Sequence, residues 1–124
     1  MLVRGASEAV QKVGATYDHV TVPGALEIPA VVAMAAGTGK YDAFVALGCV
    51  IRSNNYHFEV VCNESARGLG ELAIKNNLAI GNGILTVENK EQAIDRADPN
   101  KKNRGADAVN AALAVLELKR KWGA

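Results

Sequence analysis

The sequence has 124 residues, of which 49% are hydrophobic and 22% are charged, and this composition predicts one folded domain rather than two domains or a disordered tail. The 14 Lys and Arg against 13 Asp and Glu leave a formal net charge of +1, which excludes the large positive excess of a general nucleic-acid binder. A chain of this length buries roughly two-thirds of its unfolded surface, so it needs neither a disulfide nor a metal ion to stay folded.

The N-terminal third of the chain alternates between helix and strand signals. Apolar residues at helical spacing predict a helix over residues 2–13. Residues 18–22 alternate β-branched and polar side chains, which predicts a short strand, and the turn signal of Pro23 and Gly24 ends it. A second helix is predicted over residues 27–36.

The rest of the chain carries the strongest periodic signals. Residues 42–51 are nearly all apolar, as in a strand that is covered on both faces. One apolar stripe predicts a long helix over residues 57–76, and a second apolar strand follows over residues 80–87. A short charged helix over residues 88–97 precedes a polar loop and a last helix over residues 106–121.

The order of these elements defines the expected fold class. Alternating helices and strands imply parallel strands joined by right-handed crossovers, which is a three-layer α/β/α sandwich with a short parallel sheet. Gly68 and Gly70 each cost the long helix about 1 kcal/mol relative to alanine. We therefore expect the helix to pack closely against a neighbour at both glycines.

Cysteine usage and the longest uncharged stretch indicate where the protein works. Cys49 and Cys62 lie in apolar patterns without metal-ligand spacing, which predicts buried, reduced thiols in a cytoplasmic protein and no metal site. Residues 28–39 carry no charge but contain proline and glycine, so they are not expected to span ~30 Å of hydrocarbon. Residues 1–5 lack the layout of a signal peptide, and export is not expected.

Ligands of open parallel sheets bind beyond the carboxyl ends of the strands, so the residues after each predicted strand are the candidates for chemistry. The segments at and after the three strand ends are VPGALEIP (22–29), GCVIRSNNYHF (48–58) and GILTVEN (83–89). Two further segments lie downstream, EQAIDRA (91–97) and NRG (103–105).

In this order, these segments resemble the lumazine synthase family over nearly the whole chain. The resemblance implies a flavodoxin-like fold and a transferase of riboflavin biosynthesis without metal or organic cofactor. Such an enzyme condenses 5-amino-6-ribitylaminouracil with 3,4-dihydroxy-2-butanone 4-phosphate and releases phosphate and water. It also implies a homopentamer, or a shell of pentamers, with active sites between subunits, and neither nucleic acid nor membrane as a partner.

His57 is the candidate catalytic residue. Taken alone, a histidine at a helix start is most simply a hydrogen-bonded, unreactive residue. The resemblance implies instead that His57 carries protons during imine formation and phosphate elimination, which suits a group that titrates near neutral pH.

The resemblance also assigns substrate contacts to other positions. Glu27 alone reads as a carboxylate in the first turn of a helix, and Arg96 alone reads as a solvated residue or a partner of Gln92 at i,i+4 spacing. The family pattern implies that residues 25–27 hold the ribityl chain, that residues 49–51 line the pyrimidine, and that Arg96 clamps the phosphate. The full set of implied substrate-binding residues is Ala25, Leu26, Glu27, Cys49, Val50, Ile51, Asn54, Asn55, Asn82, Arg96 and Arg104.

The chain departs from the family pattern at several of these positions. Residues 53–57 read SNNYH where the family has Gly-x-Thr-x-His, Asn82 replaces a residue that is often aromatic, and Arg104 replaces the lysine of Asn-Lys-Gly. The first strand of the family is absent, so neighbouring strand edges are expected to carry unpaired amides and carbonyls.

These departures motivate a second hypothesis, a scaffold derived from lumazine synthase that assembles but has impaired or absent catalysis. A third reading, a flavin- or nucleotide-binding module, lacks its usual support because no Gly-rich phosphate loop is present. Under the enzyme hypothesis we expect His57, Arg96 and Arg104 to surround one anion-accepting cavity, if necessary across neighbouring chains.

Overall fold

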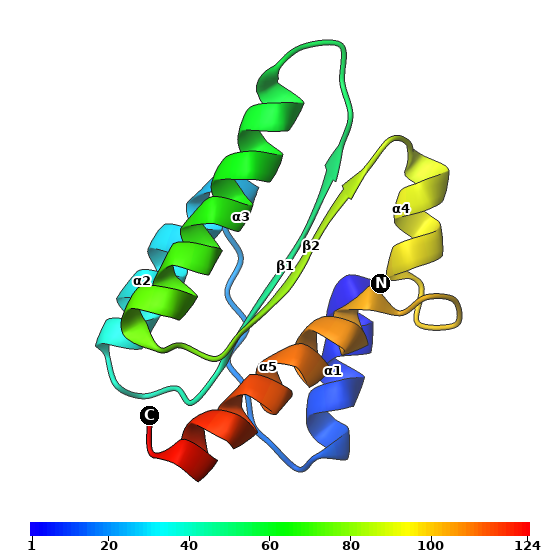
Figure 1. Ribbon diagram of the computed structural model, residues 1–124. Helices are drawn as coiled ribbons and strands as arrows, with labels where there is room; N and C mark the ends of the chain where they lie inside the picture. The colour runs from blue at the N-terminus through cyan, green and yellow to red at the C-terminus, as the bar shows by residue number, and fades with distance from the viewer.

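Two long parallel strands form the centre of the molecule, with helices on both faces (Figure 1). The computed structural model describes residues 1–124, and no helix in it is both long enough and apolar enough to cross a membrane. In chain order the elements are α1 (Leu2–Lys12), η1 (Ala25–Glu27), α2 (Ile28–Gly37), β1 (Phe44–Ile51), α3 (His57–Asn76), β2 (Ile80–Val87), α4 (Lys90–Ala97) and α5 (Arg104–Trp122).

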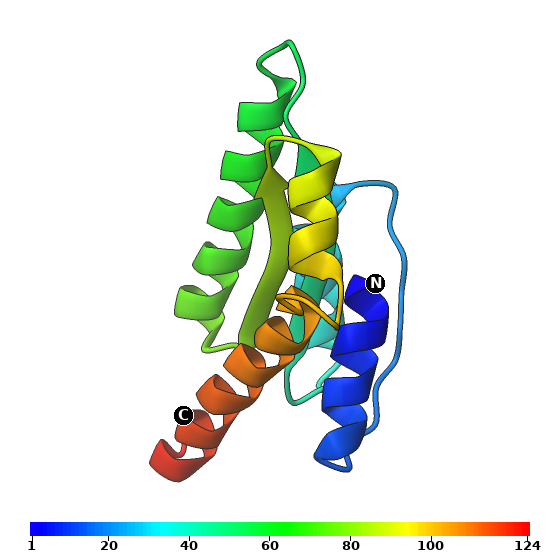
Figure 2. The same cartoon turned by 90° about the vertical axis from the view of Figure 1, so that its right-hand side faces the viewer.

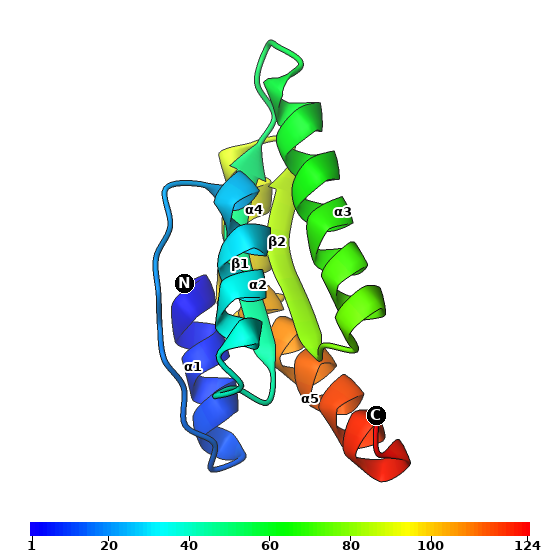
Figure 3. The same cartoon turned by 90° about the vertical axis from the view of Figure 1, so that its left-hand side faces the viewer.

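The helices divide into two layers, as Figures 1 and 3 show. α2 and α3 pack together on one face of the strands, where Val32, Ala46 and Leu69 are buried in one cluster. α1 and α5 pack together on the other face, where Val109 is buried with two alanines of α1. The predicted three-layer α/β/α arrangement is therefore confirmed.

Most predicted elements lie close to their observed bounds. The helix over residues 57–76 and the strand over residues 80–87 begin and end where the sequence places them. The apolar stripe of α3 faces inward, because Phe58, Val61 and Leu69 are all buried.

The predicted strand over residues 18–22 is wrong. Residues 11–21 are all exposed, and the segment between α1 and η1 has no regular structure. It runs past the outside of the molecule (Figure 2), and its one side-chain tie is a hydrogen bond of 2.6 Å from Tyr41 Oη to Asp18 Oδ2. Alternating β-branched residues fit a pleated surface only where a neighbouring strand provides one, and none lies beside this segment.

The outer edge of β1 is open. Phe44 N–H donates to Ala79 O and Arg52 N–H donates to Val87 O, so the even-numbered residues of β1 direct their backbone groups to β2. The odd-numbered residues direct theirs to the opposite side, where no strand pairs with them; they are Val45, Leu47, Cys49 and Ile51. The expected unpaired strand edge is confirmed.

Both cysteines are free, but the prediction that they are buried is wrong. Cys49 is exposed near the end of β1, and Cys62 is half-buried on α3. β1 is mostly half-buried, with Ala46 as its only fully buried residue, because the open edge leaves its side chains partly uncovered. Partial desolvation still raises the pKa of both thiols above the ordinary value, which lowers their reactivity.

Glycines mark close approaches between neighbouring elements. A Cβ at Gly68 would lie 2.8 Å from the Pro29 ring, so the predicted close packing of α3 is confirmed there. At Gly70 the prediction is wrong, since a Cβ would meet nothing within 4 Å. On β2, a Cβ at Gly81 would overlap the main-chain carbonyl of Ala108 on α5.

Candidate active site

Arg52, the first residue after β1, joins three elements at the carboxyl ends of the strands. Its Nε donates to Glu88 Oε2 at 2.6 Å and its Nη1 donates to Glu59 Oε1 at 2.6 Å. Its guanidinium carbon lies 4.5 Å from the centre of the Phe58 ring, in cation–π geometry. The end of β1, the start of α3 and the end of β2 are thereby held together.

The contact with Arg52 changes the pKa of the Glu59 carboxyl group. The hydrogen bond from Arg52, helped by a backbone hydrogen bond, holds the pKa of Glu59 below its ordinary value of 4.5. A carboxylate whose pKa is lowered by folding stabilises the folded state above its unfolded pKa, and this contribution is lost as the pH falls through the folded pKa.

We therefore expect Glu59→Gln to be less stable than the wild type at about pH 7, and the difference to shrink as the pH falls through the folded-state pKa of Glu59. The difference should be small, because the pair is partly exposed to solvent. Urea denaturation from about pH 7 downwards measures it, and the lowered pKa of Glu71 cancels because both proteins contain that residue. A stability difference that does not change with pH would contradict the ion pair.

His57 is the first residue of α3 and its side chain is exposed. Its backbone N–H donates to Asn55 Oδ1 at 3.0 Å, and Ser53 Oγ lies 3.2 Å from the same oxygen. The imidazole makes no hydrogen bond within the chain and is free to contact a ligand. Asn55 thus orients the start of α3, whereas Asn54 is exposed and has no side-chain partner.

Residues 25–27 and 49–51 lie around the carboxyl half of β1. η1 packs against both β1 and α3 and leads directly into α2. The Glu27 carboxylate is exposed, and it lies beside Gly24, whose Cβ would be 3.2 Å from Glu27 Oε1. Cys49 and Ile51 are exposed on the open edge, so their backbone groups are available to a ligand, and Val50 between them is half-buried.

Asn82 and Arg104 come together on the other side of the sheet. They line a pocket of about 290 Å³ that β2 and α5 form between them. Asn82 Oδ1 accepts a hydrogen bond from the N–H of Ile84 at the outer edge of β2, and Arg104 Nη1 donates to Asp107 Oδ2 at 2.9 Å. This pocket includes neither His57 nor Glu27 nor Arg96.

Arg96 lies on α4 and is half-buried. Its contact with Gln92 is confirmed, although Arg96 Nη1 donates to the main-chain carbonyl at 3.3 Å rather than to the side chain. The Gln92 side chain instead accepts from Glu88 N–H at 2.8 Å. Asn89 Oδ1 caps α4 by accepting from Gln92 N–H at 2.9 Å. Arg96 is thus linked through Gln92 and Glu88 to Arg52, and not to Arg104; we call Arg52, Glu59, Glu88 and Phe58 the Arg52 cluster. A single cavity that joins His57, Arg96 and Arg104 stays a prediction.

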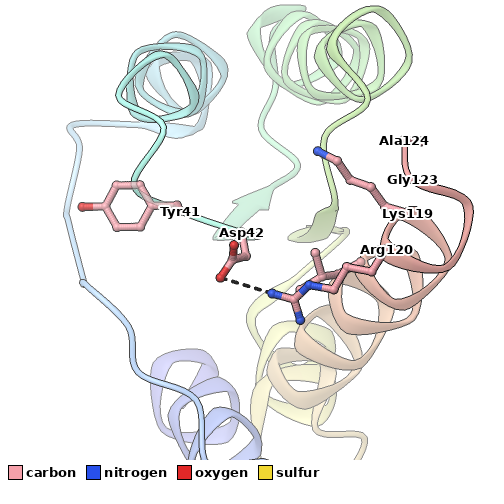
Figure 4. A pocket seen from close by; sticks show the side chains of 7 residues that line it. Tyr41, Asp42, Lys119, Arg120, Gly123 and Ala124 are labelled. Atoms are coloured by element: carbon pink, nitrogen blue, oxygen red, sulfur yellow. Dashed lines mark ion pairs between the residues drawn. The ribbon is translucent and has the colours of Figure 1, made fainter.

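A second pocket, of about 230 Å³, lies at the opposite end of the molecule (Figure 4). It is formed by the start of β1 and the end of α5, and Arg120 reaches Asp42 across it at 3.4 Å while the Tyr41 ring points away. None of the candidate residues lines this pocket, so it takes no part in the proposed chemistry.

Sequence reasoning missed the Arg52 cluster. Its signal was present, because Arg52 stands directly after a predicted strand and Glu88 directly after the next one. Parallel strands bring such positions to one edge of the sheet.

Comparisons with known proteins identify the family of this chain. The sequence matches the family described as 6,7-dimethyl-8-ribityllumazine synthase over residues 1–120. It is 57% identical to the 6,7-dimethyl-8-ribityllumazine synthase of Zymomonas mobilis, with 98% of this chain and 86% of that protein covered. It is also 57% identical to the enzyme of that name from Sphingopyxis alaskensis, with 99% and 86% covered. The similarity to 6,7-dimethyl-8-ribityllumazine synthase 1 of Rhizobium meliloti is 56%, with 99% and 84% covered.

Proposed function

Because the chain belongs to the 6,7-dimethyl-8-ribityllumazine synthase family, we propose that it forms 6,7-dimethyl-8-ribityllumazine from 5-amino-6-ribitylaminouracil and 3,4-dihydroxy-2-butanone 4-phosphate. This is a transferase reaction of riboflavin biosynthesis, and we place it in the cytoplasm. The observation that carries the proposal is 57% identity over nearly the whole chain.

His57 is the proposed proton carrier. Imine formation requires a proton for the oxygen that leaves as water, and elimination of phosphate requires a proton to be taken from carbon. An exposed imidazole without a partner in the chain can both donate and accept a proton through its ring nitrogens. Its fixed position at the first turn of α3 supports this role.

The open edge of β1 supports the proposed binding of the pyrimidine. The free amides and carbonyls of Cys49 and Ile51 can pair with the polar edge of the ring, much as a neighbouring strand would. The Glu27 carboxylate is exposed, which supports its proposed role as an acceptor of hydrogen bonds from ribityl hydroxyls. Ala25, Leu26 and Val50 contribute main-chain groups and packing to the same region.

The phosphate site is proposed to combine the loop before α3 with cationic side chains. Asn54 and Asn55 offer side-chain amide nitrogens to an anion, the start of α3 favours negative charge, and Arg96 offers a planar guanidinium for bidentate contact. Arg104 lies with Asn82 in the separate pocket on the β2 side of the molecule. Their proposed substrate contacts therefore require a neighbouring copy of the chain, and we propose a homopentamer or a larger assembly of pentamers.

An assay with both substrates tests this function. Formation of the lumazine is followed by its absorbance, against the spontaneous reaction, while light scattering gives the mass of the assembly. We expect turnover above the spontaneous rate by an oligomer. An oligomer that yields no product above that rate would instead establish the scaffold alternative, which no structural observation favours.

A further inference from the structure

Arg52 is anchored at both its main chain and its side chain. Its N–H donates to Val87 O at 2.9 Å, which continues the ladder between the strands by one residue. Its guanidinium contacts Glu59 and Glu88 and covers the ring of Phe58. Residues 53–56 leave from this anchored point and return to it at α3, so Arg52 holds both ends of the loop that precedes His57.

The same contacts continue to α4. Arg52 binds the carboxylate of Glu88, and the backbone N–H of Glu88 donates to Gln92 Oε1. The main-chain carbonyl of Gln92 then accepts a hydrogen bond from Arg96 Nη1. An unbroken series of hydrogen bonds therefore connects the start of the helix that carries His57 with the side chain of Arg96.

Solvent exposure indicates what these contacts achieve. The side chains of Arg52 and Glu88 are 46% and 57% exposed. Ion pairs at this exposure contribute little to global stability, since water competes for both partners. The main effect of these contacts is geometric. Two carboxylates from different elements and one aromatic ring together hold the guanidinium in one orientation.

We propose that Arg52 is a positioning residue that sets the place of the His57 imidazole relative to the Arg96 guanidinium. The inference rests on the proposed function, in which the imidazole moves protons and the guanidinium holds the phosphate. Arg52 itself touches no reacting atom. A misplacement of about 1 Å in such a site costs on the order of 100-fold in rate. Removing the Arg52 side chain should therefore lower the rate far more than its small contribution to stability would suggest.

The chain offers a matched control in Arg67. Arg67 also holds two carboxylates, Glu64 at 2.7 Å and Glu71 at 3.1 Å, but all three lie on the exposed face of α3 away from the loop. Arg67→Met therefore removes two ion pairs of the same kind as Arg52→Met does, without touching the proposed site.

We expect Arg52→Met to lower kcat by about 10- to 100-fold and to raise KM for the butanone phosphate more than KM for the pyrimidine. Arg52→Lys should recover part of kcat, because an ammonium can hold one of the two carboxylates. Arg67→Met should keep the kinetics of the wild type, and the melting temperatures of Arg52→Met and Arg67→Met should be similar.

Amide hydrogen exchange over residues 53–59 provides a readout that does not depend on turnover. Faster exchange in Arg52→Met, but not in Arg67→Met, is the expected result. Unchanged exchange, or wild-type kinetics in Arg52→Met, overturns the positioning role. A wild-type protein without turnover refutes the proposed function, and the exchange experiment then still decides whether Arg52 orders the loop.

Discussion

His57→Ala is expected to lower kcat by about 10²- to 10⁴-fold, the usual contribution of a positioned proton carrier. KM should change less, because phosphate and pyrimidine contacts come from other residues. The loss should be incomplete, since holding two substrates side by side accelerates their condensation without proton transfer. Steady-state kinetics with both substrates measure the effect.

The only other histidine provides the control for this experiment. His19 is exposed in the irregular segment between α1 and η1, far from the strand ends along the chain. His19→Ala should therefore retain the full kcat. If His57→Ala retains full kcat as well, the proton carrier is not His57 and the proposed chemistry must be reassigned.

Gly81→Ala is expected to destabilise the protein by about 1–3 kcal/mol, the usual cost of overpacking. The added methyl group would overlap the main-chain carbonyl of Ala108, which is rigid because it belongs to α5. β2 and α5 must therefore separate, and they are among the most extensively packed pairs of elements in the structure. Chemical denaturation monitored by circular dichroism measures the loss.

The matched substitution Gly70→Ala should act in the opposite direction. Gly70 lies inside α3 with open space around its Cα, so alanine adds helix propensity without a clash. A stabilisation of about 0.5–1 kcal/mol is expected. Equal effects of the two substitutions would show that the close approach of β2 and α5 is not rigid.

The long elements could be predicted because their pattern is local. In α3, one stripe of apolar residues at helical spacing determines both the bounds of the helix and its buried face, whatever packs against it. Residues 80–87 likewise form a mostly apolar run, interrupted by Asn82 and Thr86, between polar segments. The strand predicted over residues 18–22 failed because a strand depends on a neighbour that the local sequence does not reveal.

Prediction of the candidate site has a similar limit. The positions of His57 and Glu27 at helix starts follow from local sequence, and their proposed roles follow from family resemblance. The contacts of Arg52 with Glu59 and Glu88 depend on where three elements end in space, and sequence spacing alone does not give that. The separation of Arg104 from His57 depends on the path of α5 past the far side of β2, which is equally non-local.

The unpaired edge of β1 makes each newly synthesised copy of the chain prone to misassembly. Cys49 and Ile51 present free main-chain groups and apolar side chains together, which is the combination that recruits other extended chains. An isolated copy is therefore exposed to misassembly and fibre growth for as long as this side stays uncovered. Rapid covering of β1 after synthesis, by substrate or by protein, would keep the pool of vulnerable molecules small.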